Sequence, residues 1–201
     1  AATDARAFEA KWKGKLEAAA KRSGNDGIGA ALKEYEALDE ILGRIGSFAG
    51  LTYFSDTSNP ANGKLYGDAQ SKLTDISSSL LFFTLELNRI DDATMEAAMA
   101  NDALAGHYRP WLVDLRKDKP HQLDDQLEQL FLEKSMTSAA ALNRLFDETM
   151  TDLRFEIDGK SLALEETLNL LQEPDTETRK KAAQALSTTF KANARVFTLI
   201  T

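Results

Sequence analysis

Residues 153–164 read LRFEIDGKSLAL and form the only clear break from helical patterning in the chain. Leu153 to Ile157 alternates apolar and polar side chains, which is typical of a half-buried strand. Asp158-Gly159 favours a tight hairpin turn, because Gly accepts the positive φ that such turns require. Residues 161–164 then return as a second short strand. The sequence therefore predicts one β-hairpin, which must pack on helices because a lone hairpin is only marginally stable in water.

Helical patterning extends outward from this hairpin in both directions. We predict helices over 4–22, 28–54, 61–89, 92–99, 108–115, 123–134, 138–152 and 165–171 and from Thr176 onward, with a connection at 101–106. Apolar residues three or four positions apart give the long helices one buried stripe each. The predicted fold class is all-α, with about eight helices, several of them long and antiparallel, and one small hairpin near 153–164.

A joint at 135–137 divides the predicted helices into two regions. We expect a helical bundle over 1–134 and a helix-hairpin-helix region over 135–201, together forming one compact unit. In the bundle, the helix at 123–134 is expected to turn its apolar residues inward. Those residues are Leu123, Leu127, Leu130 and Phe131.

Glycines interrupt the predicted helix at 28–54. Gly43, Gly46 and Gly50 fall within two turns, and each costs ~1 kcal/mol relative to Ala in a helix interior. We interpret them as sites where a neighbouring helix approaches closely; a groove for extended peptide backbone is the alternative. Gly27-Ile28-Gly29 resembles part of a dinucleotide loop, but no strand precedes it and the third Gly of that motif is missing.

The composition excludes several classes of partner and site. The 201 residues suit one domain or a compact pair of subdomains. Acidic residues outnumber basic ones, 32 to 24, and the net charge of −8 argues against nucleic acid or an anionic membrane as a partner. The absence of cysteine excludes disulfides and thiolate zinc sites and favours a cytoplasmic location. No apolar run approaches the ~20 residues of a transmembrane helix.

Residues with catalytic potential are few. His107 and His121 are the two histidines, and neither belongs to a His-Glu-x-x-His zinc motif. We therefore predict no catalytic, cofactor-binding or metal-binding residue in this chain. Asp91-Asp92 and Asp124-Asp125 stand at predicted helix starts, where capping explains them better than catalysis.

Four residues in the segment 107–121 each have two possible roles, a structural one and contact with a ligand or another domain. We interpret His121 as a hydrogen-bonded structural histidine, with contact to a peptide or to an absent domain as the alternative. Tyr108, Arg109 and Trp111 have the same alternative, although Tyr108 and Trp111 are more typical of a core.

An ordered set of segments resembles the amino-terminal region of oligoendopeptidase F, over nearly the whole chain. The segments are Tyr35-Glu36-Ala37-Leu38, 80–88, Tyr108-Arg109-Pro110-Trp111-Leu112, Lys119-Pro120-His121, 133–137, 145–148, Leu153-Arg154-Phe155 with Asp158-Gly159, Asn169-Leu170-Leu171, Pro174-Asp175 and Arg179. That family consists of bacterial zinc metallopeptidases related to thimet oligopeptidase. Their zinc motif lies downstream of the region matched here, so no catalytic residue is carried over to this chain.

The resemblance implies a role in a larger enzyme. The helical amino-terminal domain would form one wall of a channel that admits short unfolded peptides, and a carboxy-terminal zinc-containing catalytic domain would form the other. We expect this chain to be an inactive fragment, since it does not begin with Met and its last predicted helix has no stop signal. Its exposed interface is expected to promote a homodimer. A stand-alone helical module that binds a peptide or protein is the alternative function.

Overall fold

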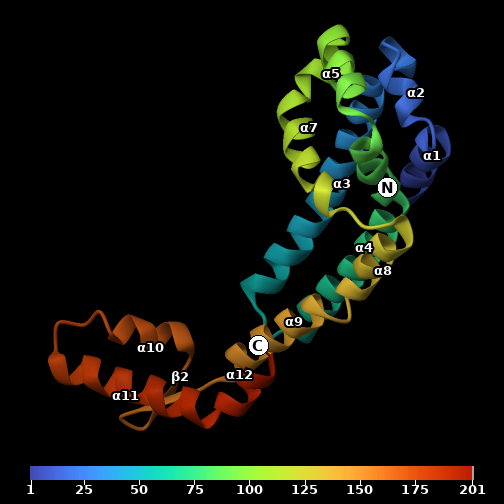
Figure 1. Cartoon of the computed structure of the whole chain (residues 1–201). Helices are drawn as coiled ribbons and strands as arrows, with labels where there is room; N and C mark the ends of the chain where they lie inside the picture. The colour runs from blue at the N-terminus through green and yellow to red at the C-terminus, as the bar shows by residue number, and fades with distance from the viewer. Residues whose placement is uncertain (201) are drawn as a thin grey trace. The chain divides into compact units, whose positions relative to one another are not determined.

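The structure is a computed structural model that describes residues 1–200 (Figure 1). It confirms the predicted class, a mainly α-helical chain with a small antiparallel sheet of two strands. The long helices are α3 (Ile28–Ser55) and α4 (Pro60–Arg89). Among the helices described, none combines the length and the apolar character needed to cross a membrane.

The remaining elements are mostly short. In chain order, the elements before α3 are α1 (Ala2–Trp12), α2 (Leu16–Ala20) and the 3-10 helix η1 (Gly24–Asp26). After α4 come α5 (Asp92–Asn101), α6 (Ala103–His107), α7 (Arg109–Leu115), the 3-10 helix η2 (Arg116–His121), α8 (Asp125–Ser135) and α9 (Ala139–Asp152). The chain continues with β1 (Phe155–Ile157), β2 (Lys160–Leu162), α10 (Leu164–Leu170), α11 (Thr176–Ala192) and α12 (Ala194–Ile200).

Contacts divide the chain into two compact units. The first contains Ala1–Leu51 and Leu65–Met136, and the second contains Thr52–Lys64 and the chain from Thr137 onward. The turn between α3 and α4, with the adjoining ends of both helices, therefore belongs to the second unit. Each unit has buried residues of its own.

Aromatic rings form the centre of the first unit. Phe8 of α1 packs edge-on against Phe83 of α4, with ring centroids 5.2 Å apart. Tyr35 of α3 stacks on Phe83 at 4.5 Å and also lies 6.1 Å from Phe8. Gly46 further along α3 faces Leu73, which precedes Phe83 in α4. A later residue of α3 therefore contacts an earlier residue of α4, so the two helices run antiparallel. This confirms the predicted antiparallel pairing of long helices.

Arg116 links η2 to the junction between α4 and α5. Its guanidinium donates hydrogen bonds to the carbonyl oxygens of Leu87 and Ile90, at 2.6 and 2.7 Å, and also to the Asp92 carboxylate. Lys119 donates a second charged hydrogen bond to Asp92 at 2.9 Å. The side chain of Arg116 is only 12% exposed, so these bonds satisfy carbonyls at the end of α4 that the helix itself leaves without donors.

The start of α3 packs closely against α6. A Cβ built on Gly29 would lie 2.7 Å from the Ala105 nitrogen and 2.8 Å from the Leu104 Cβ, and one on Gly27 would lie 2.8 Å from the Ser23 Cα. No larger residue fits at either position unless the backbone moves. The Gly-x-Gly pattern therefore serves helix packing, and the sequence argument against a dinucleotide loop agrees with this arrangement.

The hairpin is the centre of the second unit. Phe155 pairs with Leu162 and Ile157 with Lys160 in an antiparallel register. Asp158 and Gly159 both have positive φ, 52° and 77°, as a type I′ turn requires. Phe155 is fully buried and packs edge-on against Phe190 of α11, with centroids 5.7 Å apart. The hairpin predicted from Asp158-Gly159, and its packing on a helix, are both confirmed.

Three predicted helix boundaries are wrong. The helix at 4–22 breaks because Gly14 adopts φ 75° and donates its backbone N–H to Glu86 of α4 at 2.7 Å. The connection at 101–106 is mostly the helix α6, because Asp102 accepts a hydrogen bond from the Leu104 N–H and caps it. The helix predicted from Thr176 onward ends at Ala192, where the Asn193 side chain donates to the Thr189 carbonyl, and α12 follows as a separate helix.

The inward orientation predicted for the apolar residues of α8 is also wrong. Leu123, Leu127, Leu130 and Phe131 are exposed, Phe131 to 64%. Polar side chains of α8 contact α4 instead: Asp125 pairs with Arg89, and Gln129 donates to Ser78. A second exposed row of apolar side chains lies on α3 and consists of Ile41, Ile45, Phe48 and Leu51.

We expect Gly29→Ala to lower the free energy of unfolding by about 2 kcal/mol, because the added methyl group would overlap the backbone of α6. Gly43→Ala is the matched control within the same helix. A Cβ at Gly43 meets nothing within 4 Å. The higher helix propensity of Ala should therefore raise the free energy of unfolding of this variant by about 1 kcal/mol. Urea unfolding of both variants measures the difference. Equal effects would contradict the close packing at Gly29.

We expect Asp92 to make stability depend on pH. Hydrogen bonds from Lys119 and then from Arg116 lower the pKa of Asp92. The stabilisation is therefore present above the unfolded pKa of about 3.9 and is lost as the pH falls through the folded value. Asp92→Asn should destabilise the protein at neutral pH and should differ less from the parent in acid. Asp118→Asn, which removes an exposed carboxylate nearby, is the control in thermal unfolding measured across pH. A difference independent of pH would contradict this assignment.

Candidate functional site

Two depressions flank α3 in the first unit. The larger, about 380 Å³, lies between α1 and α3, and the smaller, about 230 Å³, lies between α3 and α7. Successive turns of α3 contribute residues to both, because positions 34, 37, 38 and 41 lie on one side of the helix and 32, 35, 36 and 39 on the other.

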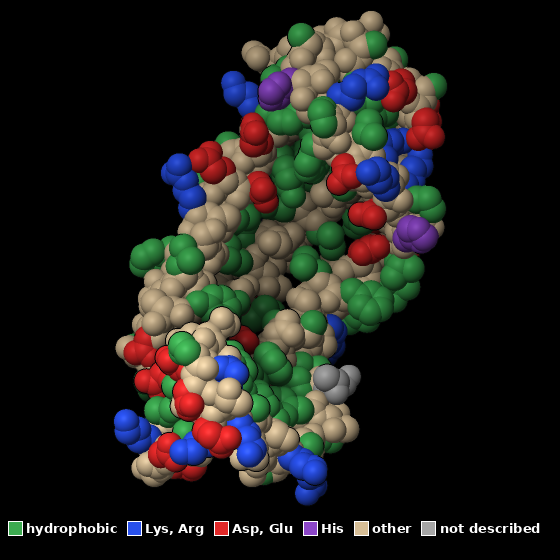
Figure 2. Space-filling view, turned by 90° about the vertical axis from the view of Figure 1, so that its left-hand side faces the viewer, with side chains coloured by type: hydrophobic (Ala, Val, Ile, Leu, Met, Phe, Trp, Pro, Cys, Tyr) green, Lys and Arg blue, Asp and Glu red, His purple; other side chains and the backbone are tan. Residues whose placement is uncertain are grey.

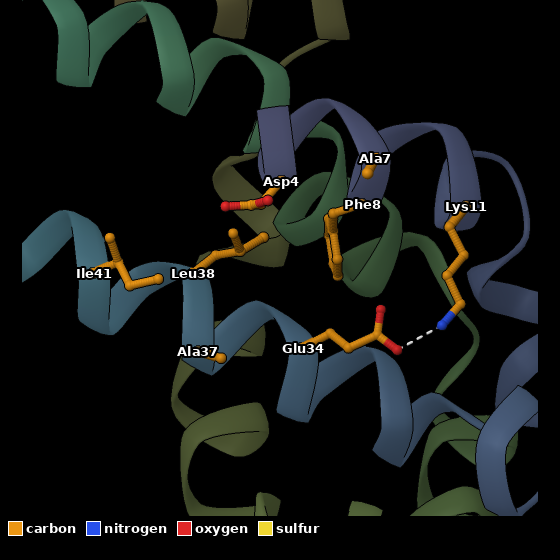
Figure 3. A pocket seen from close by; sticks show the side chains of 8 residues that line it. All are labelled: Asp4, Ala7, Phe8, Lys11, Glu34, Ala37, Leu38 and Ile41. Carbon is orange, nitrogen blue, oxygen red and sulfur yellow. Dashed lines mark hydrogen bonds and ion pairs between the residues drawn. The ribbon is translucent and has the colours of Figure 1, made fainter. Parts of the chain in front are cut away.

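The larger depression, which we call the α1–α3 pocket, has an apolar floor (Figure 3). Phe8 of α1 points toward α3, and Leu38 and Ile41 face it from α3. At one end, Lys11 reaches across the gap to Glu34, with 2.5 Å between nitrogen and oxygen. The Trp12 indole donates to the other oxygen of Glu34 at 2.9 Å. Since Glu34 already has two donors, this pocket offers apolar contact more than new polar contacts.

The smaller depression, which we call the α3–α7 pocket, combines aromatic and acidic side chains. Its lining consists of Leu32, Tyr35, Glu36, Asp39, Tyr108 and Trp111. The rings of Tyr35 and Trp111 lie 6.0 Å apart, inclined at 41°. Trp111 is 39% exposed, so part of its ring faces solvent.

Burial is the largest cause of a raised pKa at both tyrosines of the α3–α7 pocket. The Tyr108 hydroxyl donates to the Glu36 carboxylate at 2.6 Å. Desolvation, followed by this hydrogen bond and the Glu36 charge, raises the pKa of Tyr108 to about 12. Burial, with a smaller contribution from the Asp39 charge, also raises the pKa of Tyr35. The pocket thus places the hydroxyl groups of Tyr35 and Tyr108 in the same lining as the side chains of Glu36 and Asp39.

The surface of the first unit shows the same combination of charge and apolar contact. On the face of this unit that Figure 2 displays, acidic and basic side chains flank recessed hydrophobic ones.

A third depression, about 380 Å³, lies in the second unit between the hairpin and α11. Lys181 of α11 crosses it to pair with Asp158 in the hairpin turn, at 2.8 Å. This ion pair, like the Phe155–Phe190 contact, joins the hairpin to α11, so the depression has a structural explanation.

The residues singled out in the sequence have separate roles. Tyr108 and Trp111 both line the α3–α7 pocket, whereas Arg109 pairs with Glu96 at 2.5 Å. His107 ends α6 and packs edge-on against Tyr108, with centroids 5.1 Å apart. His121 is exposed, and within residues 1–200 its ring makes no hydrogen bond, so the hydrogen-bonded role predicted for it is wrong.

The first aspartate of each acidic pair caps a helix, as predicted. Asp91 accepts from the Thr94 N–H at the start of α5, and Asp124 accepts from the Gln126 and Leu127 N–H groups at the start of α8. Asp92 and Asp125 form ion pairs instead. In the described part of the chain, no three His, Asp or Glu side chains gather in a way that could hold a metal ion.

The close helix approach favoured for the three glycines of α3 is wrong. A Cβ built on Gly46 would lie 3.4 Å from Leu73 Cδ1, one on Gly50 would lie 3.9 Å from Tyr66 Cε2, and one on Gly43 would meet nothing within 4 Å. These are ordinary van der Waals distances, so α4 does not approach closely enough to require glycine. The alternative, a groove for extended peptide backbone, stays a prediction.

This chain is similar in sequence to known oligopeptidases. The family model described as Oligopeptidase F matches residues 86–155. Oligopeptidase PepF of Bacillus subtilis is 25% identical over 186 residues, which is 90% of this chain and 27% of that protein. The resemblance predicted from the sequence is confirmed. The chain thus spans about a quarter of the length of this relative of oligoendopeptidase F type.

A solved structure of the same type shares the fold. The crystal structure of oligoendopeptidase-F from Enterococcus faecium matches 99% of this chain and 38% of its own, with a TM-score of 0.82 at 18% sequence identity. The oligoendopeptidase F model matches the part of the chain that holds Tyr108 and Trp111. Tyr35, Glu36 and Asp39 lie outside that match, although Tyr35 and Glu36 belong to a segment that the sequence analysis had already related to the family.

We expect Glu36→Gln to lower the pKa of Tyr108 from about 12 while leaving it above the ordinary value of about 10. Desolvation is the larger cause of the shift and remains after the substitution. Because the folded pKa is raised, the associated stability is present below pH ~10 and is lost as the pH rises toward 12. Titration of ring carbons in ¹³C-labelled tyrosine, with Tyr108→Phe to identify the signal, measures the pKa. An unchanged value would contradict the Glu36 contact.

Proposed function

We propose that this chain is the amino-terminal domain of an oligoendopeptidase F-type zinc metallopeptidase that hydrolyses short peptides. The proposal places it as one wall of the channel through which unfolded peptides reach the catalytic domain. Its main support is the correspondence of nearly the whole chain to about a third of a solved oligoendopeptidase-F. The ordered match to 27% of a named oligopeptidase adds a second, sequence-based line of support.

The distribution of apolar side chains supports a partner domain. The apolar row on α3 and the exposed apolar residues of α8 both lie in the first unit, and Leu51 in the α3 row is 73% exposed. Exposed rows of this kind are typical of surfaces that other protein covers. We infer that the catalytic domain covers at least one of them in the complete enzyme, and that isolated copies of this chain associate through the same residues.

The chemistry of hydrolysis is assigned to the rest of the enzyme. The two histidines lie in separate elements, α6 and η2, and neither is followed by Glu. Zinc and the residues that activate water would therefore come from the catalytic domain. This chain would limit access and contact the substrate away from the scissile bond. A cytoplasmic location of the complete enzyme is part of the proposal.

We expect the 201-residue chain to leave a quenched-fluorescent peptide library uncleaved, with or without added zinc. A product that continues the reading frame through a His-Glu-x-x-His segment should cleave short peptides and lose that activity on chelation. Replacing the Glu of that segment by Gln is the matched control for contaminating peptidases. Zinc-dependent cleavage by the 201-residue chain alone would contradict the proposal, and so would a longer product that leaves all peptides intact.

A further inference from the structure

We propose that the α3–α7 pocket binds the positively charged group of a peptide, an ammonium or a guanidinium. The choice of a peptide as the carrier of this group rests on the proposed function. The choice of a cation rests on the pocket itself, whose walls, charge and size are described below.

Aromatic rings give the pocket a fixed wall. Tyr35 is held by its stack on Phe83, which is fully buried. Trp111 lies against Tyr35 from α7 and keeps 39% of its surface exposed. An organic cation above such rings is attracted by their negative faces, most strongly by that of tryptophan. The wall exists before any ligand arrives, so little ordering is needed on binding.

Two carboxylates add negative charge beside this wall. Glu36 and Asp39 lie three positions apart on α3, and both line the pocket. The Tyr108 hydroxyl holds one oxygen of Glu36 and leaves the rest of that carboxylate able to accept further hydrogen bonds. Within residues 1–200, neither Glu36 nor Asp39 forms an ion pair with Lys or Arg.

The basic residues closest in sequence to the pocket do not pair with its carboxylates. Arg109, next to Tyr108, pairs with Glu96 at 2.5 Å. Lys33, one turn before Glu36 on α3, is exposed and forms an ion pair with neither Glu36 nor Asp39 within residues 1–200. A positively charged ligand would supply the ion-pair partner that these two carboxylates lack.

The volume of the pocket and the chemistry of its lining limit the kinds of ligand that it can bind. The volume of about 230 Å³ is below that of typical pockets for whole cofactors, about 300–1,000 Å³, and suits one side chain or one chain end. Aromatic carbon forms much of the lining, whereas sites for metal cations are built mainly from oxygen atoms. Phosphate-bearing ligands would meet two carboxylates and be repelled.

The test measures binding to the 201-residue chain by nuclear magnetic resonance, with the Trp111 indole N–H as the reporter. The Trp12 indole, which is bonded to Glu34, is the internal reference. Three pentapeptides separate the sources of the cation. The first carries a central Lys between blocked ends, the second carries norleucine there between blocked ends, and the third carries norleucine with a free amino terminus.

We expect saturable shifts of Trp111 with the first or third peptide, and binding about tenfold weaker or undetectable with the second. A response to the first peptide alone assigns the site to a basic side chain, and a response to the third alone assigns it to a peptide amino terminus. Equal binding of all three, or no shift of Trp111 with any, would overturn the proposal.

Variants on α3 locate the charge dependence. Combining Glu36→Gln with Asp39→Asn should weaken binding of the cationic peptide about tenfold. Glu40→Gln is the matched control, because Glu40 lies on the same helix but pairs with Arg44 at 2.8 Å and does not line the pocket. Thermal unfolding confirms that both variants fold. Equal affinities of the double variant and the control would also overturn the proposal.

This experiment and the cleavage experiment fail independently. The peptide titration uses only the present chain and needs no catalytic domain. Loss of cleavage in the longer product with cation binding intact would refute the peptidase assignment and leave the pocket. Cleavage by the longer product without cation binding would refute the proposed site in the α3–α7 pocket and leave the peptidase assignment in place.

Discussion

The stack of Tyr35 on Phe83 is the contact on which the first unit depends. It joins α3 to α4 at the level where Phe8 brings in α1, so one buried ring from α4 orients two other helices. Tyr35 also lies 6.0 Å from Trp111 of α7. Core packing and the aromatic wall of the α3–α7 pocket are therefore one structure, and the pocket cannot change shape without disturbing the core.

Local signals explain why much of the fold was predictable. Asp158-Gly159 specifies a turn that few other dipeptides adopt, and Asp91, Asp124 and Asp175 cap helices through their own neighbouring backbone. Such contacts join residues only a few positions apart, so they can be recognised from a short stretch of sequence. The failures are of the opposite kind. The break at Gly14 depends on Glu86, 72 residues away, and no local pattern contains that partner.

The candidate site follows the same rule. Tyr108 and Trp111 lie in one short segment that resembles the family, but Glu36 and Asp39, which line the same pocket, lie on α3 and become their neighbours only through tertiary packing. The helix α8 shows a further limit. Its apolar stripe predicts burial, but in this structure polar residues of α8 contact α4 and the apolar side chains are exposed. Amphipathic patterning indicates that a face is suited to burial and does not identify the partner that would cover it.

The close approach of α3 to α6 at Gly29 has a consequence for how related sequences evolve. Any descendant that keeps these two helices at their present distance must keep glycine at that position, since even alanine would meet backbone at 2.7 Å. Selection for this distance between two helices would then preserve the Gly27-Ile28-Gly29 segment. The preserved segment resembles part of a nucleotide-binding motif although no nucleotide is involved. A glycine retained across a lineage can thus record geometry, with no ligand involved.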